Sequence, residues 1–572
     1  MERVEQKKQS SCTAGPLTSA SLRQAVSVMQ MMVASCYGPY GRLKQIHNDS
    51  GGYVTTTSQS AALLGGISVT HPALQLLVAS IRNHTFAFSD CGLFAAILCC
   101  SLIDRCLRLP VSTHKVVKAH QSLTDMCLSY LKSEDCACKI NVDFTHSKLL
   151  LALTRSVLYS KPACMMTRTE VDYVSLLIVK AFLYKVPNVS ATSHLLGRTV
   201  VVAVEGASVM DSAFIPGVLI EAPACGWSRT MPSSRLPPTN IKLALFSGSL
   251  CGEFSETGDG TVEVMAGVDP EKVMLDQLLD LGRQLVDDDV QILLCQKVIH
   301  PSLKQYLKEH DICALDRLGA ALMEPLSEMT GAQPVASLCP VSSASYGRLQ
   351  QISNVSYGNK QYLHLLPDTT AVCSIVLCNR NETSLKELTR TCQTAERTLN
   401  HLLKEPWLLL GGGCTEAHVA AYIRYQVSSL PGSHLEELRC TAAEYKLAAD
   451  CFCSALEAAA RSLEHDGGEI LTDFQDGHVW SVPPEASGGE YAGAGHTCGC
   501  RLLHNKADLQ WTVLGSPCPP FSPRTRTEVP PVLLAEEALI LDGFSAKCNG
   551  IRVAVDTAGL ILDLAYVVKD TN

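Results

Sequence analysis

A block of short β-type runs stands between two long helical stretches, and this order limits the possible architectures more than any other feature of the 572-residue chain. The β-type runs are bounded by turn residues and lie at 199–204, 241–246 and 290–295. Helical periodicity lies between and after them, at 271–285, 301–308 and 318–329. Because strands and helices alternate, we expect an α/β layer domain over about residues 198–370, followed by another strand at 372–377.

Helical patterns flank this block on both sides. Before it they lie at 22–33, 72–81, 92–106, 149–157 and 171–183, and after it at 384–404, 417–427, 441–463 and 557–566. The run Gly92–Cys106 is apolar on nearly every face, which predicts a helix buried all round. The order predicts a discontinuous helical domain whose chain leaves, builds another domain and returns.

Residues 477–530 differ from the rest of the second helical stretch. Pro-Pro pairs at 483–484, 519–520 and 530–531 and a Gly-Gly pair at 488–489 interrupt a segment rich in Ser and Gly. This composition predicts a long, irregular surface insertion that is partly disordered.

Charge and hydropathy exclude two classes of partner. The chain has 47 Lys and Arg against 56 Asp and Glu, a net charge of −9 that is spread along its length, so we expect no nucleic-acid partner, which would need a clustered basic face. The longest apolar run, Gly92–Ile103, is shorter than the roughly 20 residues of a membrane span, so we expect no membrane insertion. Residues 1–10 are charged and lack an apolar core, which predicts no secretory signal and a cytosolic protein.

Cysteine is frequent, at 26 residues. In a cytosolic protein these thiols stay reduced, and most are expected to be small buried apolar residues. The closely spaced pairs are Cys99/Cys100, Cys136/Cys138, Cys451/Cys453 and Cys498/Cys500. No C-x-x-C motif occurs, so the spacing predicts no zinc and no other metal cofactor of that kind.

Three loops could approach a phosphate group. Gly38-Pro39-Tyr40-Gly41 predicts a tight turn with accessible amides, or an ordinary turn that ends a helix. Gly411, Gly412 and Gly413, between an apolar run and a helix, allow the backbone to approach a ligand or another segment.

The third loop, Ser89-Asp90-Cys91-Gly92, directly precedes the buried helix. A helix N-terminus favours anions, and Asp90 could hold a magnesium ion that bridges phosphates. The alternative is that Ser89 or Asp90 simply caps the helix.

A fourth segment is a weak alternative nucleotide site. It contains Thr192, Gly197, Arg198 and Thr199, which resemble the end of a P-loop. It precedes a strand instead of a helix, so no helix dipole would face the phosphate. Gly258-Asp259-Gly260-Thr261 also precedes a strand-like run and is discounted for the same reason. The sequence has no H-E-x-x-H and no G-x-S-x-G motif, so no motif supports a zinc-protease or serine-hydrolase activity.

Together these motifs resemble those of a group II chaperonin subunit. The family's L-G-P-x-G-x-x-K corresponds to residues 37–44, its histidine–proline helix start to His71-Pro72, and its G-D-G-T-T to residues 89–93 at the family's interval. The apical D-S-x-x-x-x-G-V corresponds to residues 211–218, C-Q-K to residues 295–297 and G-G-G to residues 411–413. Within the family, the chain is most similar to the Bardet–Biedl chaperonin-like branch.

The resemblance implies a multidomain α and α/β fold with helical equatorial, small intermediate and α/β apical domains. The implied equatorial parts are residues 1–133 and 399–572, with the irregular insertion at 477–530. The implied intermediate arms are residues 134–197 and 371–398, and the client-binding apical domain is residues 198–370. The stretch 269–295 looks shorter than the family's lid-forming protrusion, so a built-in lid is not expected.

The resemblance also implies where a nucleotide would bind and what the chain has lost. ATP with magnesium would lie against Gly38, Pro39, Asp90, Gly92 and Gly411–Gly413, with Asp90 as the metal ligand. The family's water-positioning aspartate falls on Thr394, and the aspartate of its N-D-G falls on Gln59. A hydroxyl is no base at neutral pH, so we expect weak nucleotide binding at most, no catalytic residue and no useful ATPase cycle.

Apolar residues on two apical helices are the candidates for a client-binding groove, or they cover their own sheet. They are Val273, Leu278, Leu281, Leu285, Leu303, Tyr306 and Leu307.

The resemblance implies a chaperonin-like protein that assists the assembly of protein complexes, above all of the BBSome for ciliogenesis. Its implied partners are protein clients, sister Bardet–Biedl chaperonin-like proteins, the cytosolic chaperonin and BBSome subunits, and its implied places are the cytosol and the centrosome or basal body. The alternatives are an active ATP-dependent, ring-forming foldase and a scaffold without a client groove.

Overall fold

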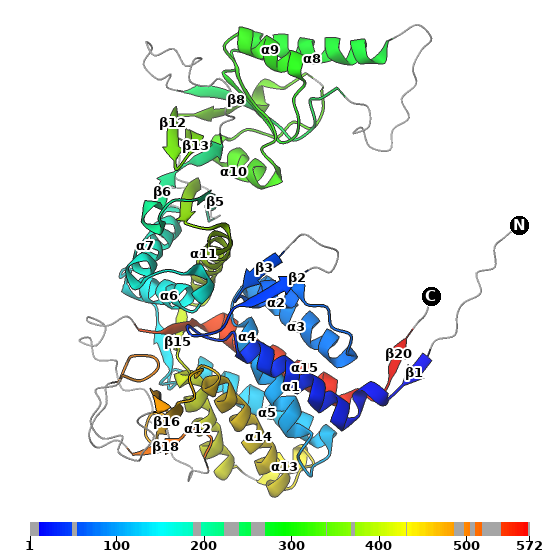
Figure 1. Cartoon of the computed structure of the whole chain (residues 1–572), viewed down its shortest axis with the longest axis vertical. Helices are drawn as coiled ribbons and strands as arrows, with labels where there is room; N and C mark the ends of the chain where they lie inside the picture. Colours follow the sequence, from blue (N-terminus) through cyan, green and yellow to red (C-terminus); the bar gives the residue numbers. More distant parts are fainter. Residues whose placement is uncertain are drawn as a thin grey trace, which may run out of the picture. The chain divides into compact units, whose positions relative to one another are not determined.

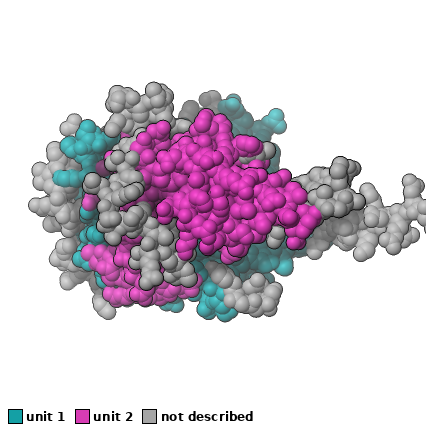
Figure 2. Space-filling view, turned by 90° about the horizontal axis from the view of Figure 1, so that it is seen from above, with its two compact units in different colours: residues 1–179, 386–572 teal, residues 180–385 magenta. Residues whose placement is uncertain are grey.

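The chain divides into two compact units in its structure, a computed structural model. Unit 1 is residues 1–179 and 386–572, and unit 2 is residues 180–385 (Figure 2). The structure describes residues 11–47, 54–186, 196–221, 240–252, 269–338, 340–367, 372–430, 432–484, 497–503, 510–516 and 539–569. Unit 2 is thus inserted into unit 1, as the order of strands and helices predicted. The finer division into equatorial, intermediate and apical domains stays a prediction.

Unit 1 is built around α4 (Gly92–Cys106), whose residues from Gly92 to Ile103 are all buried. The predicted all-round burial of this helix is therefore confirmed. Its neighbours are α1 (Ser19–Ala34), α3 (Pro72–Phe88), α14 (Ala442–Arg461) and α15 (Phe544–Asp563) (Figure 1). Helices α5 (Thr113–Lys132) and α12 (Cys414–Ser428) pack against α14. Segments from both ends of the sequence thus share one core.

Helix α15 corrects one predicted boundary. The pattern predicted a helix at 557–566, whereas α15 begins at Phe544 and ends at Asp563. The part of the helix before residue 557, more than three turns, was missed because Lys547 is polar yet buried, which interrupts the apolar periodicity that marks a helix.

The other helices of unit 1, and the two that continue into unit 2, complete the helical framework. They are α2 (Ser60–Gly66), α6 (Lys148–Tyr159), α7 (Arg168–Tyr184), α11 (Glu382–Leu402) and α13 (Gly432–Glu437). The chain passes between the units within α7 and within α11. Every helix among the described residues is too short or too polar to span a bilayer.

Small antiparallel sheets connect distant segments of unit 1. One contains β4 (Lys139–Asn141), β15 (Trp407–Leu410) and β19 (Leu541–Gly543), with β15 central. A second contains β16 (Glu469–Asp473), β17 (Val479–Val482) and β18 (Trp511–Val513), with β16 central. Two-stranded pairs join β2 (Lys44–His47) to β3 (Val54–Thr57) and β1 (Ser11–Thr13) to β20 (Val567–Lys569).

The second of these sheets corrects the prediction of an irregular surface insertion over 477–530. Strands β17 and β18 belong to that stretch, and Trp480, Cys500 and Leu514 are at most 2% exposed. The described parts of the insertion therefore contain two strands and a buried interior. A prediction that rests on Pro and Gly content does not take into account the aromatic and thiol side chains that can form a buried core.

Unit 2 has a four-stranded sheet with both faces covered. Its strands are β8 (Ile241–Phe246), β9 (Ile292–Cys295), β10 (Cys313–Leu315) and β11 (Gly347–Leu349), in the order β10-β9-β8-β11, with β11 antiparallel. Helices α8 (Pro270–Asp287) and α9 (Pro301–Glu309) contribute to the core on one face, and α10 (Ala320–Thr330) to the core on the other (Figure 1). The predicted α/β layer is confirmed.

Two further sheets of three strands complete unit 2. One has the order β12-β13-β7, from Gln351–Tyr357, Lys360–Leu366 and Val218–Glu221. The other has the order β5-β14-β6, from Arg198–Glu205, Val372–Asn379 and Ala213–Pro216. The predicted strands at 199–204 and 372–377 are therefore neighbours, and they run parallel.

Candidate functional site

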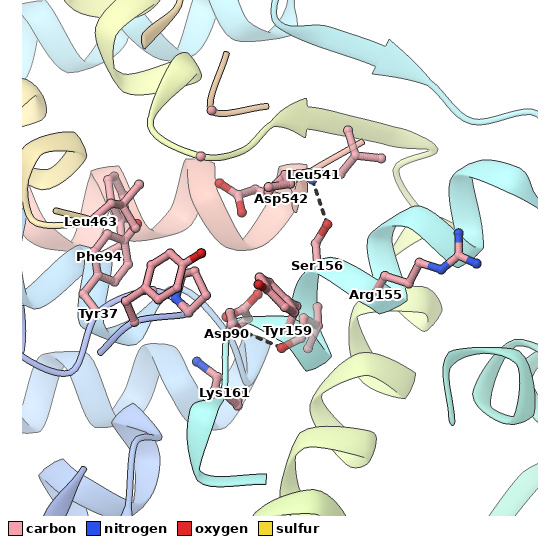
Figure 3. A pocket seen from close by; sticks show the side chains of 18 of the residues that line it. Tyr37, Asp90, Phe94, Arg155, Ser156, Tyr159, Lys161, Leu463, Leu541 and Asp542 are labelled. Carbon is pink, nitrogen blue, oxygen red and sulfur yellow. Dashed lines mark hydrogen bonds between the residues drawn. The ribbon is translucent and has the colours of Figure 1, made fainter. Parts of the chain in front are cut away.

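Three of the predicted phosphate-approaching loops meet at one cavity of unit 1, which has a volume of about 290 Å³ (Figure 3). Gly38 and Pro39 line it from the turn after α1, Asp90 and Gly92 from the start of α4, and Gly412 from the loop after β15. Gly411 and Gly413 flank Gly412 but do not line the cavity. The tertiary structure thus brings together residues that lie more than 370 positions apart.

The start of α4 has an unusual backbone. Ser89 and Cys91 are both left-handed, with φ of 62° and 59°, at the two positions where the resembling motif has glycine. The N-cap is Cys91, and no side chain caps the helix. The alternative that Ser89 or Asp90 caps α4 is therefore wrong. Oδ1 of Asp90 instead accepts a hydrogen bond from the amide of Cys91 at 2.8 Å.

A buried ion cluster, which the sequence analysis missed, lies at one side of this cavity. Nζ of Lys547 donates to Oε1 of Glu416 at 2.5 Å and to Oδ2 of Asp542 at 2.8 Å, and it lies 4.1 Å from the centre of the Phe94 ring. Burial opposes the charged form, yet Asp542 and Glu416 raise the pKa of Lys547 well above its ordinary value. Because two carboxylates neutralise this ammonium group, it does not offer a free positive charge to a phosphate.

A second cavity, of about 650 Å³, adjoins the first, and Ser60, Asp90 and Lys161 line both. Gln59 and Thr394, the two positions where the family has aspartate, line the second cavity. Oγ1 of Thr394 donates to the carbonyl of Arg390 at 3.1 Å, along its own helix. The structure therefore brings Gln59, Asp90 and Thr394 to one cavity, as the resemblance implied.

The side-chain amide nitrogen of Gln59 donates two hydrogen bonds to α11. Its Nε2 donates to the carbonyl of Glu387 at 3.1 Å and to Oγ1 of Thr391 at 2.7 Å. An aspartate lacks these donors, so the glutamine makes a bond pattern that the family's carboxylate cannot make.

The second cavity is strongly basic. Arg82, Lys161, Arg390 and Arg397 line it, and Asp90 is the only carboxylate among its lining residues. Glu396, the carboxylate two positions after Thr394, does not line the second cavity. Glu387 is only 1% exposed and does not line the second cavity either. The carboxylate of Glu387 lies 3.9 Å from Nη1 of Arg390. No carboxylate other than Asp90 therefore lines the cavity that contains Thr394.

A magnesium nucleotide fits this site only in part. The left-handed Gly38 and Gly412, with φ of 82° and 64°, allow a close approach of the backbone, and the uncapped N-terminus of α4 favours negative charge. Asp90 is the residue that would hold the metal ion. Leu93, where the resembling motif has threonine, lines the cavity without offering a hydroxyl, and Asp542 adds a negative charge to the wall.

The weak alternative nucleotide site is not supported. Arg198 and Thr199 lie at the start of strand β5, and Thr192 lies outside the described residues. The guanidinium of Arg198 donates from Nε to Glu328 at 2.8 Å and also pairs with Glu324. An arginine that is paired with two carboxylates and is the first residue of a strand makes no phosphate loop with the neighbouring Gly197.

The structure corrects most of the predicted client-binding set. Five of the seven residues have exposures of at most 4% and belong to the core between the sheet and helices α8 and α9; they are Leu278, Leu281, Leu285, Leu303 and Leu307. These residues cover their own sheet, which was the alternative. Val273 is 41% exposed and Tyr306 is half-buried, so only these two remain available to a partner.

Comparison with known proteins agrees with this architecture. The chain is 50% identical, over the full length of both chains, to a Homo sapiens protein named Molecular chaperone MKKS, and 48% identical to the Mus musculus protein of that name. It is 22% identical to thermosome subunit alpha of Archaeoglobus fulgidus, over 79% of this chain and 81% of that protein. The TCP-1/cpn60 chaperonin family model matches residues 29–572. The predicted fold class, multidomain α and α/β, is confirmed, and the chain belongs to the TCP-1/cpn60 chaperonin family.

Proposed function

We propose that this chain is a chaperonin-like protein that binds other proteins and assists their assembly into complexes without an ATP-driven cycle of its own. Family membership supports protein clients as its partners. The specific proposal, which follows the resemblance, is assembly of the BBSome for ciliogenesis, in the cytosol and at the centrosome or basal body. The proposed partners are the sister Bardet–Biedl chaperonin-like proteins, the cytosolic chaperonin and BBSome subunits.

One observation supports the loss of ATP hydrolysis above the others. Thr394 stands where the family positions its attacking water, and its hydroxyl is bonded to the carbonyl of Arg390. A hydroxyl cannot accept a proton from water at neutral pH, and loss of a general base alone costs about 10²–10⁴ in rate. That loss corresponds to about 3–5 kcal/mol of activation barrier. Asp90 cannot serve as both metal ligand and base.

Phosphate release from ATP by the purified full chain tests this proposal. We expect wild-type turnover to equal that of Asp90→Ala, because neither protein has a functional hydrolytic site. Thr394→Asp should raise turnover above the wild-type value because it restores a carboxylate. Thr394→Asn should not, because asparagine has the shape of aspartate but is no base. Wild-type turnover comparable to that of a thermosome subunit assayed beside it, and abolished by Asp90→Ala, would overturn the proposal.

The ring-forming foldase makes a different prediction about assembly. Native mass spectrometry of the purified chain would then give homogeneous rings of about sixteen subunits. The proposed function predicts monomers or small mixed complexes instead.

A test of client binding needs variants that change the surface of unit 2 and leave its core intact. Val273→Asp and Tyr306→Asp alter the two accessible side chains of the predicted set and should weaken the capture of BBSome subunits. Leu278→Asp is unsuitable, because Leu278 is 1% exposed and a buried carboxylate would unfold the unit. A scaffold without a client groove predicts unchanged capture by both surface variants, provided that circular dichroism shows them folded.

A further inference from the structure

Four buried metal-binding side chains from three separate segments meet beside the loop that carries Gly412. They are Cys414, His478, Cys498 and Cys500, and their ligand atoms all lie within 4.8 Å of one another. Each of the four side chains is at most 6% exposed. We propose that these residues bind a structural zinc ion, so that the insertion after β16 is fastened by metal to the start of α12.

The distances fit a tetrahedral zinc site. Sγ of Cys498 lies 3.3 Å from Sγ of Cys500, which in turn lies 3.3 Å from Nδ1 of His478. Zinc–sulfur bonds of about 2.3 Å and zinc–nitrogen bonds of about 2.0 Å give tetrahedral edges of about 3.8 Å between two sulfur atoms and about 3.5 Å between sulfur and nitrogen. The two observed separations are shorter than these edges by about 0.5 Å and about 0.2 Å, and the other ligand pairs lie within 4.8 Å.

A disulfide does not explain the cluster. The sulfur atoms of Cys498 and Cys500 are 3.3 Å apart, well beyond the S–S bond length of about 2.05 Å, and all three cysteines are free thiols. Three thiols and an imidazole are the ligand set of closed structural zinc sites. With four protein ligands, no coordination position is left for a substrate, so the site would be structural and not catalytic.

The backbone around the ligands is arranged as a support for them. The amide of Leu503 donates to Sγ of Cys498 at 3.1 Å, and the amide of Cys498 donates to the carbonyl of Leu503 at 2.9 Å. Amide-to-sulfur bonds of this kind stabilise a thiolate and orient it toward a metal. Cys414 is the first residue of α12, where the helix dipole also favours a thiolate.

The turn that carries His478 is held by a buried aspartate, which accepts hydrogen bonds from backbone amides of that turn. Oδ1 of Asp473 accepts from the amide of His478 at 2.7 Å, and Oδ2 accepts from the amide of Asp476 at 3.0 Å. Asp473 is 0% exposed. The turn between β16 and β17 is thus fixed in the shape that presents His478 to the three sulfur atoms.

The site would connect the insertion to the nucleotide-type cavity. Gly499, between two of the ligands, lines that cavity with Arg501, and its backbone touches Gly412. Bound metal would therefore hold one wall of the cavity in place. The sequence-based expectation of no zinc rested on the absence of C-x-x-C motifs and therefore overlooked this site. Its C-x-C pair is completed by ligands 20 and 84 positions before Cys498, and only the folded chain brings these residues together.

A second group, Cys106, His120 and Cys451, is a poorer candidate. Its three ligand atoms are also within 4.8 Å of one another, but among the described residues it has no fourth ligand. Nδ1 of His120 lies 4.0 Å from Sγ of Cys106. This group supplies the control for the experiment.

Elemental analysis of the full chain, purified without a metal-affinity tag from zinc-supplemented medium, tests the proposal. We expect about one zinc ion per chain in the wild type, in Cys106→Ser and in Cys453→Ser, and a loss of most of that zinc in Cys498→Ser and Cys500→Ser. Cys453 is a matched control because it is as deeply buried as the ligands but lies outside the cluster. Zinc that persists in Cys498→Ser but is lost in Cys106→Ser would overturn the assignment.

A measurement on the wild type keeps the test decisive if the ligand variants fail to fold. Chelator-treated protein is titrated with Co²⁺, for which three thiolates predict a strong sulfur-to-cobalt charge-transfer absorption that zinc displaces. Zinc addition should also raise the melting temperature of the chelated protein. A wild-type chain that contains no zinc, gives no such absorption and shows no shift in melting temperature would refute the site, whatever the outcome of the ATPase assays.

Discussion

Nζ of Lys547 lies 2.5 Å from Oε1 of Glu416, and only 2% of each side chain is exposed. The pair joins the first turn of α15 to the first turn of α12, directly after the Gly411–Gly413 loop. A second carboxylate, Asp542, completes the cluster at 2.8 Å. Such a pair adds little net stability when it is intact, but loss of one partner leaves an uncompensated buried charge.

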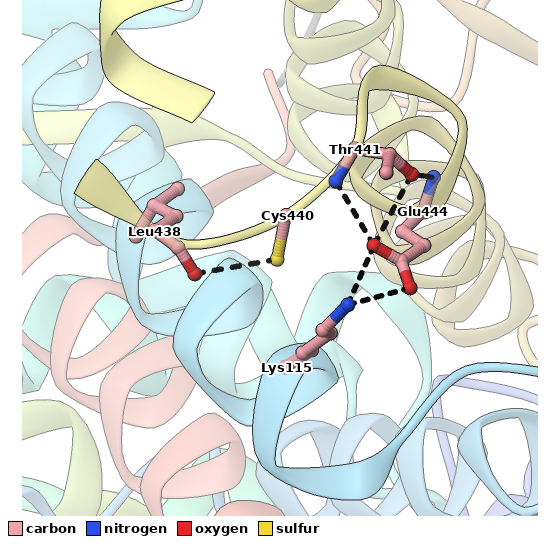
Figure 4. Close-up of polar contacts among 5 residues, drawn as sticks. All are labelled: Lys115, Leu438, Cys440, Thr441 and Glu444. Atoms are coloured by element: carbon pink, nitrogen blue, oxygen red, sulfur yellow. Dashed lines mark hydrogen bonds and ion pairs between the residues drawn. The ribbon is translucent and has the colours of Figure 1, made fainter. Parts of the chain in front are cut away.

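Lys547→Met should therefore destabilise unit 1 by about 3–5 kcal/mol, because it leaves Glu416 and Asp542 unpaired. Urea unfolding followed by tryptophan fluorescence measures this loss. The control is Lys115→Met, which breaks the pair between Lys115 and Glu444, 2.8 Å apart and partly exposed (Figure 4). That change should leave the unfolding midpoint close to the wild-type value, since water and Thr441 still solvate Glu444. Equal losses for both variants would contradict the importance of burial.

Gly412→Ala should destabilise the protein more than Gly467→Ala. Both glycines have left-handed backbones, with φ of 64° and 81°, so both substitutions carry the same conformational cost of about 1 kcal/mol. A Cβ on Gly412 would clash with the backbone of Gly499, whereas a Cβ on Gly467 meets nothing within 4 Å. The clash should add about 1–3 kcal/mol. Thermal unfolding of the two variants measures the difference, and equal melting temperatures would mean that the insertion does not pack against Gly412.

Cys91→Gly should stabilise the protein by up to about 1 kcal/mol, because φ of Cys91 is 59° and glycine adopts that conformation without strain. The control is Cys100→Gly, in the buried middle of α4, which should destabilise by more than about 1 kcal/mol through backbone entropy and lost packing. Urea unfolding midpoints compare the two. A destabilised Cys91→Gly variant would show that the thiol contributes more than the backbone strain costs.

Glu387→Gln should raise the free energy of unfolding at pH 7 by the order of 1 kcal/mol. Burial raises the pKa of Glu387 above its ordinary value of 4.5, so the folded protein binds this proton more tightly than the unfolded chain does. The contribution of Glu387 to the free energy of unfolding of the wild type is therefore fully present below pH 4.5, and it is lost as the pH rises through the raised pKa.

The advantage of Glu387→Gln over the wild type should accordingly appear as the pH rises from about 4.5 and disappear below it. Unfolding free energies measured from pH 4 to pH 8 test this dependence. Glu437→Gln, which removes an exposed carboxylate of α13, should give no such pH-dependent difference. A constant difference across the pH range would mean that Glu387 does not titrate differently in the folded state.

The order of the main helices and strands, the inserted α/β unit and the loops around Gly38, Asp90 and Gly412 could all be predicted from the amino-acid sequence. These follow from periodicity, turn residues and short motifs, which are local properties of the chain. Thr394 and Gln59 could also be placed at the site, because a spacing from a motif can be counted along the sequence.

Which side chains of those elements are buried, and which distant groups meet, became visible in the three-dimensional structure alone. It turned the predicted client residue Leu278 into core, since a helix that covers a sheet and a helix that binds a client have the same apolar periodicity. It also brought Lys547 to Glu416 and Cys414 to Cys498, because contacts between residues far apart in the chain depend on packing and leave no local pattern.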